Sequence, residues 1–188
     1  MNKLIIICFF CLALIACTSK KASQKSWLLN PELSTIAIIT TKNNAVSEVS
    51  EFKKFKGSIN QSHYLSIELD MTSLETNIPI RNERIDTHLF ETKIFPRANI
   101  HTQLKPEDLK PGIHKVTFDV DLHGVSGILT AEFMVFEENG SKIITLHKPL
   151  IVNASAFGLE QGITTLKNIA KLQSIDFTVP MHIVLTFK

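Results

Sequence analysis

The side chains that could do chemistry are scattered along this sequence and form no standard catalytic or metal-binding motif. No two histidines have HxH or HExxH spacing, and no serine lies in a GxSxG context. Metal sites and nucleophilic sites need several such groups held together, so the sequence predicts no metal site, no cofactor and no enzyme. The histidines that we interpret as surface or turn residues are His63, His88, His101, His114, His123, His147 and His182.

One pair of carboxylates has the spacing of a paired acid–base site. Asp119 and Asp121 share a face of a predicted strand, because side chains two residues apart point the same way. Carboxylates on an outward strand face are usually solvated, however, and no base or nucleophile is predicted beside them. We therefore interpret both as surface groups.

Cys17 has the clearest chemistry in the chain. Lys3 and the apolar run 4–15 have the pattern of a secretory signal, and the run is shorter than the roughly 20 residues that span a bilayer. The residues LIAC, which end at Cys17, look like a lipobox and predict cleavage after residue 16 and acylation of the thiol. Cys8 and Cys11 would leave with the signal, so no disulfide within the mature chain is expected. The alternative is an ordinary signal peptide with an incidental cysteine.

These features predict the cellular location and the domain organisation of the protein. Residues 1–16 are a lipoprotein signal peptide, residues 17–25 are a polar tether, and residues 26–188 are one domain. Acyl chains on Cys17 would bind the membrane firmly, because each buried methylene contributes about 0.8 kcal/mol. Thr18, in place of an aspartate, favours the outer membrane. We expect a protein anchored on the periplasmic side of the envelope. The formal net charge of +2 does not favour nucleic acid as a partner.

The rest of the chain consists mostly of predicted strands. Alternating or β-branched segments predict strands, and the segment 45–60 predicts two further pieces with a kink near 52–57. Asn139-Gly140 predicts a type I′ hairpin turn, and Pro180 predicts a bulge or an edge in the last strand. The predicted strands are 34–41, 63–70, 97–104, 112–123, 125–137, 142–152 and 177–187.

Two segments have helical rather than strand spacing. The stretch 76–100 enters through Pro79 and carries charged residues at helical intervals, and Pro96 stops the predicted helix. Residues 162–172 repeat apolar side chains at helical spacing. Long antiparallel strands avoid unpaired edges by closing, so we predict a mainly β fold: a closed, antiparallel, eight-stranded, lipocalin-like β-barrel with two short helices. The first helix is expected to cover one mouth.

Several ordered sequence blocks between residues 27 and 187 resemble the YceI-like family of lipocalin-like β-barrels, associated with polyisoprenoids and other long-chain lipids. In this chain Ile85 separates Arg84 from Asp86, which resembles the branch written IRNER…LF…FP. We interpret the chain as a lipoprotein-anchored member. The blocks are WLLNPELS, EVSEFKKFKGSI, TNIPIRNERIDTHLFETKIFPRA, VDLHGVSG and KPLIVNASAFGLEQGITTLKNIAKLQSIDFTVPMHIVLTF.

The resemblance implies that the barrel holds a long, slender ligand, such as an isoprenoid or quinone tail. Burial of a hydrocarbon chain contributes about 25 cal/mol per Å² of apolar surface. The alternative is that the same side chains fill the barrel completely. The candidate ligand-binding residues are Leu89, Phe90, Phe95, Val116, Phe118, Val120, Phe133, Val135, Phe157, Ile183 and Leu185.

Arg81 and Arg84 are candidates to contact an anionic or quinone headgroup, since arginine forms paired hydrogen bonds with such groups. The alternative is structural ion pairing with Glu83, Asp86 or Glu91. Two functional classes follow. One is a membrane-anchored lipid carrier or reservoir; the other is a filled-barrel interaction module of the cell envelope that binds no lipid.

Overall fold

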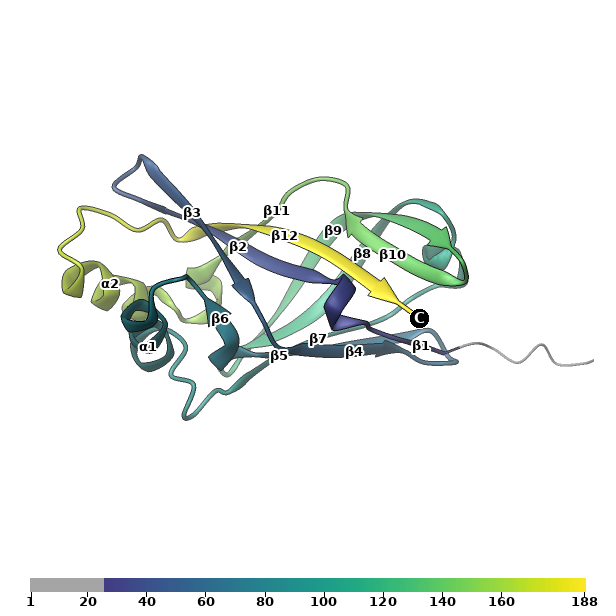
Figure 1. Ribbon diagram of the computed structural model, residues 1–188, viewed down its shortest axis with the longest axis horizontal. Coiled ribbons are helices and arrows are strands. Elements are labelled where there is room, and N and C mark those ends of the chain that lie inside the picture. The colour runs from purple at the N-terminus through teal and green to yellow at the C-terminus, as the bar shows by residue number, and fades with distance from the viewer. Residues whose placement is uncertain (1–25) are drawn as a thin grey trace, which may run out of the picture.

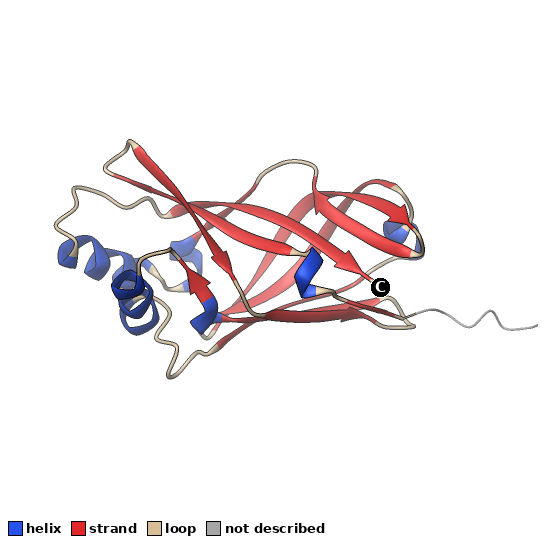
Figure 2. Cartoon of the chain, in the orientation of Figure 1, coloured by secondary structure: helices blue, strands red, loops and turns tan. Residues whose placement is uncertain are grey.

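The computed structural model describes residues 26–188, so the predicted signal peptide, the tether and Cys17 lie outside the described residues. The described chain is mainly antiparallel β-sheet with two α-helices, which confirms this part of the prediction (Figures 1 and 2). No helix in this part of the chain is long and apolar enough to cross a membrane.

Twelve strands form one curled sheet in the order β1-β4-β5-β7-β8-β9-β10-β12-β2-β3-β6, with β11 beside β12. The strands are β1 (Trp27–Leu28), β2 (Thr35–Lys42), β3 (Val46–Phe52), β4 (Phe55–Ile59), β5 (Tyr64–Asp70), β6 (Leu74–Glu75), β7 (Arg97–Gln103), β8 (Gly112–Leu122), β9 (Val125–Glu138), β10 (Ser141–Leu146), β11 (Leu150–Asn153) and β12 (Thr178–Phe187).

The predicted closed eight-stranded barrel is wrong; the molecule is a curled half-barrel of more and shorter strands. The segment predicted as one strand over 142–152 divides into β10 and β11. β6 pairs with β3 only at Glu51 and Phe52 and leaves 46–50 at an edge. At the other edge, Leu28 of β1 exchanges backbone hydrogen bonds of 2.8 and 2.9 Å with Lys188. The alternation of apolar and polar residues indicates which face of the sheet a residue occupies. It does not reveal where a strand is interrupted or that a strand is only two residues long.

Local turn chemistry follows the sequence closely. Asn139 and Gly140 both have positive φ, 51° and 75°, and join β9 to β10 as predicted. β3 ends at Phe52 and β4 begins at Phe55, which confirms the kink between two pieces. Pro180 lies opposite Ile151 of the short β11, and pairing of β12 with β2 begins only at the next residue.

Two α-helices, α1 (Pro79–His88) and α2 (Glu160–Ile169), cover one end of the curled sheet (Figure 1). Pro79 occupies the first turn of α1, where its missing N–H costs no hydrogen bond. The helices approach each other at Gly162, where an added Cβ would lie 2.5 Å from the carbonyl oxygen of His88. The short 3₁₀ helices are η1 (Pro31–Leu33), η2 (Met71–Ser73), η3 (Pro106–Leu109) and η4 (Ala154–Phe157).

Candidate functional site

The inner face of the curled sheet and the two helices enclose a cavity of about 720 Å³. Its wall is overwhelmingly apolar, because strand residues alternate and the apolar set faces inward. On β8, for example, Val116, Phe118 and Val120 line the cavity, whereas Thr117 and Asp119 between them do not. Open volume remains within the sheet, so the side chains do not fill the lumen.

Most of the predicted ligand-binding residues lie together around this cavity. Phe95 is the exception: its ring lies 4.6 Å from the His123 ring and covers Gly124, outside the cavity lining. Phe95 follows the helix and faces the β8–β9 turn, a contact that spacing along the chain does not reveal. The predicted residues that line the cavity are Leu89, Phe90, Val116, Phe118, Val120, Phe133, Val135, Phe157, Ile183 and Leu185.

Sequence reasoning missed part of the wall. Ile36 and Ile38 of β2 line the cavity, as do Ile67 and Leu69 of β5. The alternation in β5 predicted one buried face, and this signal was sufficient to include Ile67 and Leu69. In β2, β-branched or apolar residues occupy both faces, so the sequence pattern does not distinguish the inner face from the outer one.

The end of the cavity away from the helices is covered by η3. Leu109 of η3 is buried, and its carbonyl oxygen accepts a 2.8 Å hydrogen bond from the Lys142 ammonium group. The Lys142 Nζ also contacts Glu137 at 2.9 Å and lies 5.1 Å from the Trp27 ring centroid. Lys142 thus fastens η3 to the sheet.

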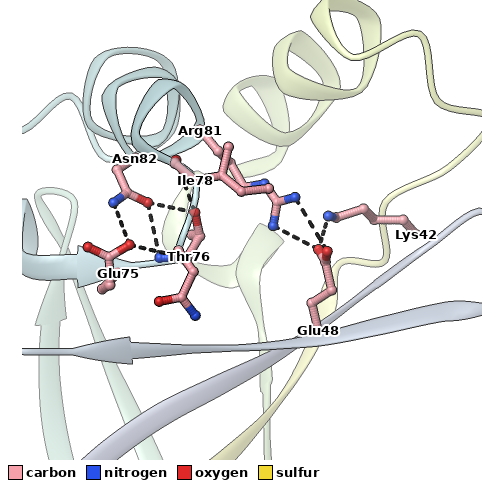
Figure 3. Close-up of polar contacts among 8 residues, drawn as sticks. Lys42, Glu48, Glu75, Thr76, Ile78, Arg81 and Asn82 are labelled. Atoms are coloured by element: carbon pink, nitrogen blue, oxygen red, sulfur yellow. Dashed lines mark hydrogen bonds and ion pairs between the residues drawn. The ribbon is translucent and has the colours of Figure 1, made fainter.

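The other end opens beside α1 and is flanked by a charged cluster (Figure 3). Arg81 of α1 donates to both carboxylate oxygens of Glu48 on β3, over 2.8 and 3.3 Å, and Lys42 of β2 contacts the same carboxylate. The hydrogen bond from Lys42, with that from Arg81, holds the pKa of Glu48 below its ordinary value despite partial burial. None of the acids weighed from sequence is the partner of Arg81.

A second polar group fixes the start of α1 against β6 (Figure 3). The Asn82 side-chain oxygen accepts hydrogen bonds from the backbone N–H and the hydroxyl of Thr76, at 3.0 and 2.6 Å. Its amide nitrogen donates to Glu75 at 2.9 Å. Ile78, the N-cap residue, provides no side-chain hydrogen bond, so these contacts hold the helix start instead.

Arg84 differs from Arg81 in its surroundings. It lines the cavity one helical turn further along α1, is half-buried, and has no hydrogen-bond or ion-pair partner among residues 26–188. The ion pairs with Glu83, Asp86 or Glu91 considered from sequence are not formed. Glu91 instead contacts His123 at 3.0 Å. Arg84 is therefore a cation available to a ligand in the cavity.

The remaining titratable groups do not assemble a reaction centre. Within the described part of the chain, no three His, Cys, Asp or Glu residues are placed to hold a metal ion. Asp119 is half-exposed and lies 3.8 Å from His101, and Asp121 accepts a hydrogen bond from Ser126. His114 lines the cavity, but its Nε2 donates to the carbonyl oxygen of Lys110 at 2.8 Å.

Comparison with known proteins identifies the family of the chain. Residues 27–187 match the model of the YceI-like domain. The chain belongs to this family. Among curated proteins, none matches the chain.

Several solved structures share the fold. The chain is similar to a polyisoprenoid binding domain from Saccharophagus degradans implicated in plant cell wall breakdown, with 28% identity, a TM-score of 0.81, and coverage of 86% of this chain and 97% of that one. BcnA of Burkholderia cenocepacia is 16% identical, with a TM-score of 0.66 and coverage of 84% and 98%. The YCEI protein of Campylobacter jejuni is also 16% identical, with a TM-score of 0.53 and coverage of 74% and 84%.

Proposed function

We propose that this YceI-like protein binds one long-chain lipid, of the polyisoprenoid or quinone-like class, and is a carrier or reservoir rather than an enzyme. The single observation that carries the proposal is the apolar cavity of about 720 Å³. This volume lies in the range of small-molecule sites, and an apolar lining with few polar groups suits a hydrocarbon chain. The similarity to a polyisoprenoid binding domain supports the same ligand class.

The lipid tail occupies the lumen and its headgroup lies at the open end beside α1. The wall residues named above contact the tail, and Arg84 contacts the headgroup because its guanidinium group has no protein partner. Arg81 contributes less, since Glu48 already engages its guanidinium group at two oxygens. A phosphate or another oxygen-rich headgroup satisfies this arrangement.

The proposed setting is the periplasmic side of the outer membrane, with Cys17 acylated. It is supported by the apolar run and the LIAC sequence, which lie outside the described residues. Replacement Cys17→Ser in the full chain should abolish incorporation of labelled palmitate. Unchanged labelling would contradict acylation at Cys17.

Lipid binding is tested on residues 26–188 produced alone. This segment contains the whole of the matched YceI-like domain, residues 27–187, so we expect it to fold without the preceding residues. Organic extraction followed by mass spectrometry should recover close to one long-chain lipid per protein molecule. Repeatedly empty extracts would contradict the proposal and favour the interaction module.

A matched pair of substitutions on β9 tests the position of the ligand. Phe133 lines the cavity, whereas Phe136, on the same strand, is 47% exposed. Phe133→Trp should lower lipid content severalfold, because the larger ring occupies the lumen, while Phe136→Trp should leave it unchanged. Circular dichroism should show both variants folded. Equal lipid content in the two variants would remove Phe133 from the binding site.

A further inference from the structure

Large apolar side chains surround the open end of the cavity and are exposed to solvent. Ile78, Ile80 and Ile169 all line the cavity, yet they are 39%, 51% and 38% exposed. Val46, at 53% exposure, lies directly opposite the cavity-lining Lys42 in the β2–β3 hairpin. These residues come from three separate segments, the hairpin, α1 and the end of α2. The three isoleucines extend the apolar lining of the cavity to the solvent-exposed surface.

Positive charge lies beside this apolar ring. The side chains of Lys167 and Lys171, at the end of α2, have no hydrogen bond or ion pair among residues 26–188, and the side chain of Arg84 is likewise unpaired. The acids without a basic partner on α1, α2 and the segment after α2 are Glu83, Asp86, Glu160 and Asp176. Asp86 and Glu160 lie at the ends of α1 and α2 away from Ile80 and Ile169. Near the opening, the three unpaired cations therefore exceed Glu83 and Asp176, and Lys42, Arg81 and Glu48 together add one more positive charge. The open end therefore complements an anionic surface.

We propose that this surface docks on an anionic lipid bilayer, so that a lipid can pass between the bilayer and the cavity. The rim is defined as Val46, Ile78, Ile80, Lys167, Ile169 and Lys171. The proposal rests on lipid binding in the cavity, as proposed above.

Docking would use the same two interactions that hold other proteins at a membrane surface. Exposed apolar side chains enter the headgroup region, and nearby lysines add electrostatic attraction to anionic lipids. In the isolated domain these isoleucines expose apolar surface to water, and no contact within the protein compensates for it. On a bilayer they are buried, and the lumen becomes continuous with the hydrocarbon. A lipid tail can then move without crossing water.

The rim lies at the end of the molecule opposite β1, where the described chain begins (Figure 1). Docking through the rim is thus separate from any anchor that precedes β1. Residues 26–188 alone report on the rim without a contribution from residue 17. The fold also provides a matched control, because Ile113 at the start of β8 is 51% exposed, as Ile80 is, but does not line the cavity.

The experiment is co-sedimentation of residues 26–188 with vesicles. One vesicle preparation contains equal amounts of phosphatidylglycerol and phosphatidylcholine, and the other contains phosphatidylcholine alone. The wild-type domain should bind the anionic vesicles more strongly, and added salt should reduce the difference. Ile80→Asp should weaken binding about tenfold or more, because it removes an inserted side chain and adds a repelled charge. Ile113→Asp should bind as the wild type does.

A second variant keeps the cavity lining intact. The double substitution Lys167→Gln and Lys171→Gln should weaken binding to anionic vesicles by about fivefold for each lysine removed, with the lipid content measured by extraction unchanged. Equal binding of Ile80→Asp and Ile113→Asp would overturn the proposal. It would also be overturned if the wild-type domain bound no vesicles and Ile80→Asp instead dissociated a dimer, since the rim would then contact a second copy.

The docking proposal and the lipid-binding proposal fail in different ways. A domain that yields lipid on extraction but binds no vesicles retains the cavity function and rejects the rim. A domain that binds vesicles through the rim and yields no lipid rejects the cavity function alone.

Discussion

Glu48 connects two cationic side chains from two other elements at the cavity mouth. Its carboxylate accepts hydrogen bonds from Arg81 of α1 and contacts Lys42 of β2, and Glu48 itself lies on β3. Because both partners are cations, the ionised form is favoured and its pKa lies below the ordinary 4.5. Glu48 therefore ties α1 to the hairpin at neutral pH.

Glu48→Gln should reduce stability at neutral pH by about 1 kcal/mol or less, as is typical for a partly exposed ion pair. A carboxylate with a lowered native pKa stabilises the fold above its unfolded pKa, and this contribution disappears as the pH falls through the native value. Urea unfolding should therefore separate variant and wild type more at about pH 7 than at about pH 3. Glu83→Gln is the control, because Glu83 is exposed and unpaired. An equal difference at both pH values would contradict the ion-pair account.

The pKa of Asp86 on α1 shifts in the opposite direction to that of Glu48. Burial raises the pKa of its carboxyl group above the ordinary 3.8, and the nearby Asp70 raises it further. The ionised form therefore destabilises the fold above the native pKa, and the cost is absent where the group is protonated in both states. Asp86→Asn should raise the unfolding temperature at neutral pH and leave it unchanged well below pH 3.8. A lower unfolding temperature at neutral pH would show that the charge is compensated.

At the scale of elements, the position of α1 depends on three kinds of contact. Asn82 holds its start to β6, Arg81 holds it to β3, and Gly162 of α2 lets the two helices approach closely. The cavity opening lies between these contacts, so helix packing sets its size. Displacement of either helix would change access to the lumen.

Gly162→Ala should destabilise the domain by about 1–3 kcal/mol, because the new Cβ meets the backbone of His88 and Leu89 at 2.5 and 2.8 Å. This loss opposes the small gain that alanine normally gives inside a helix. Asn168→Ala, at an exposed position of the same helix, should be neutral or slightly stabilising. Urea denaturation of the wild type and of both variants measures their free energies of unfolding. A stabilised Gly162→Ala variant would show that the helices are free to move apart.

At the scale of the whole molecule, the curled sheet encloses more volume than its side chains fill. Side chains around an empty apolar cavity lack dispersion contacts on one side, which lowers stability. A bound lipid tail restores those contacts and buries its own surface. The molecule is therefore expected to be more stable with lipid than without it.

Removal of lipid from residues 26–188 should lower the unfolding temperature. A ligand present at a hundred times its Kd contributes about 2.7 kcal/mol, which corresponds to about 5–10 °C for a domain of this size. Calorimetry of extracted and lipid-reloaded protein measures the shift, and Phe133→Trp should reduce it. The same unfolding temperature in both states would contradict a ligand-filled lumen.

The sequence alone determined the local features of this protein: its β-rich character, the two helices, the Asn139-Gly140 turn and the inward face of β8. These follow from the alternation of side chains along a strand and from turn stereochemistry, which act over a few residues. Only the tertiary structure decided how far the sheet curls and which distant groups meet. Arg81 and Glu48 are separated by 33 positions, and Phe95 reaches His123 rather than the lumen. Such contacts depend on how elements pack in space, and a local pattern contains no record of that packing.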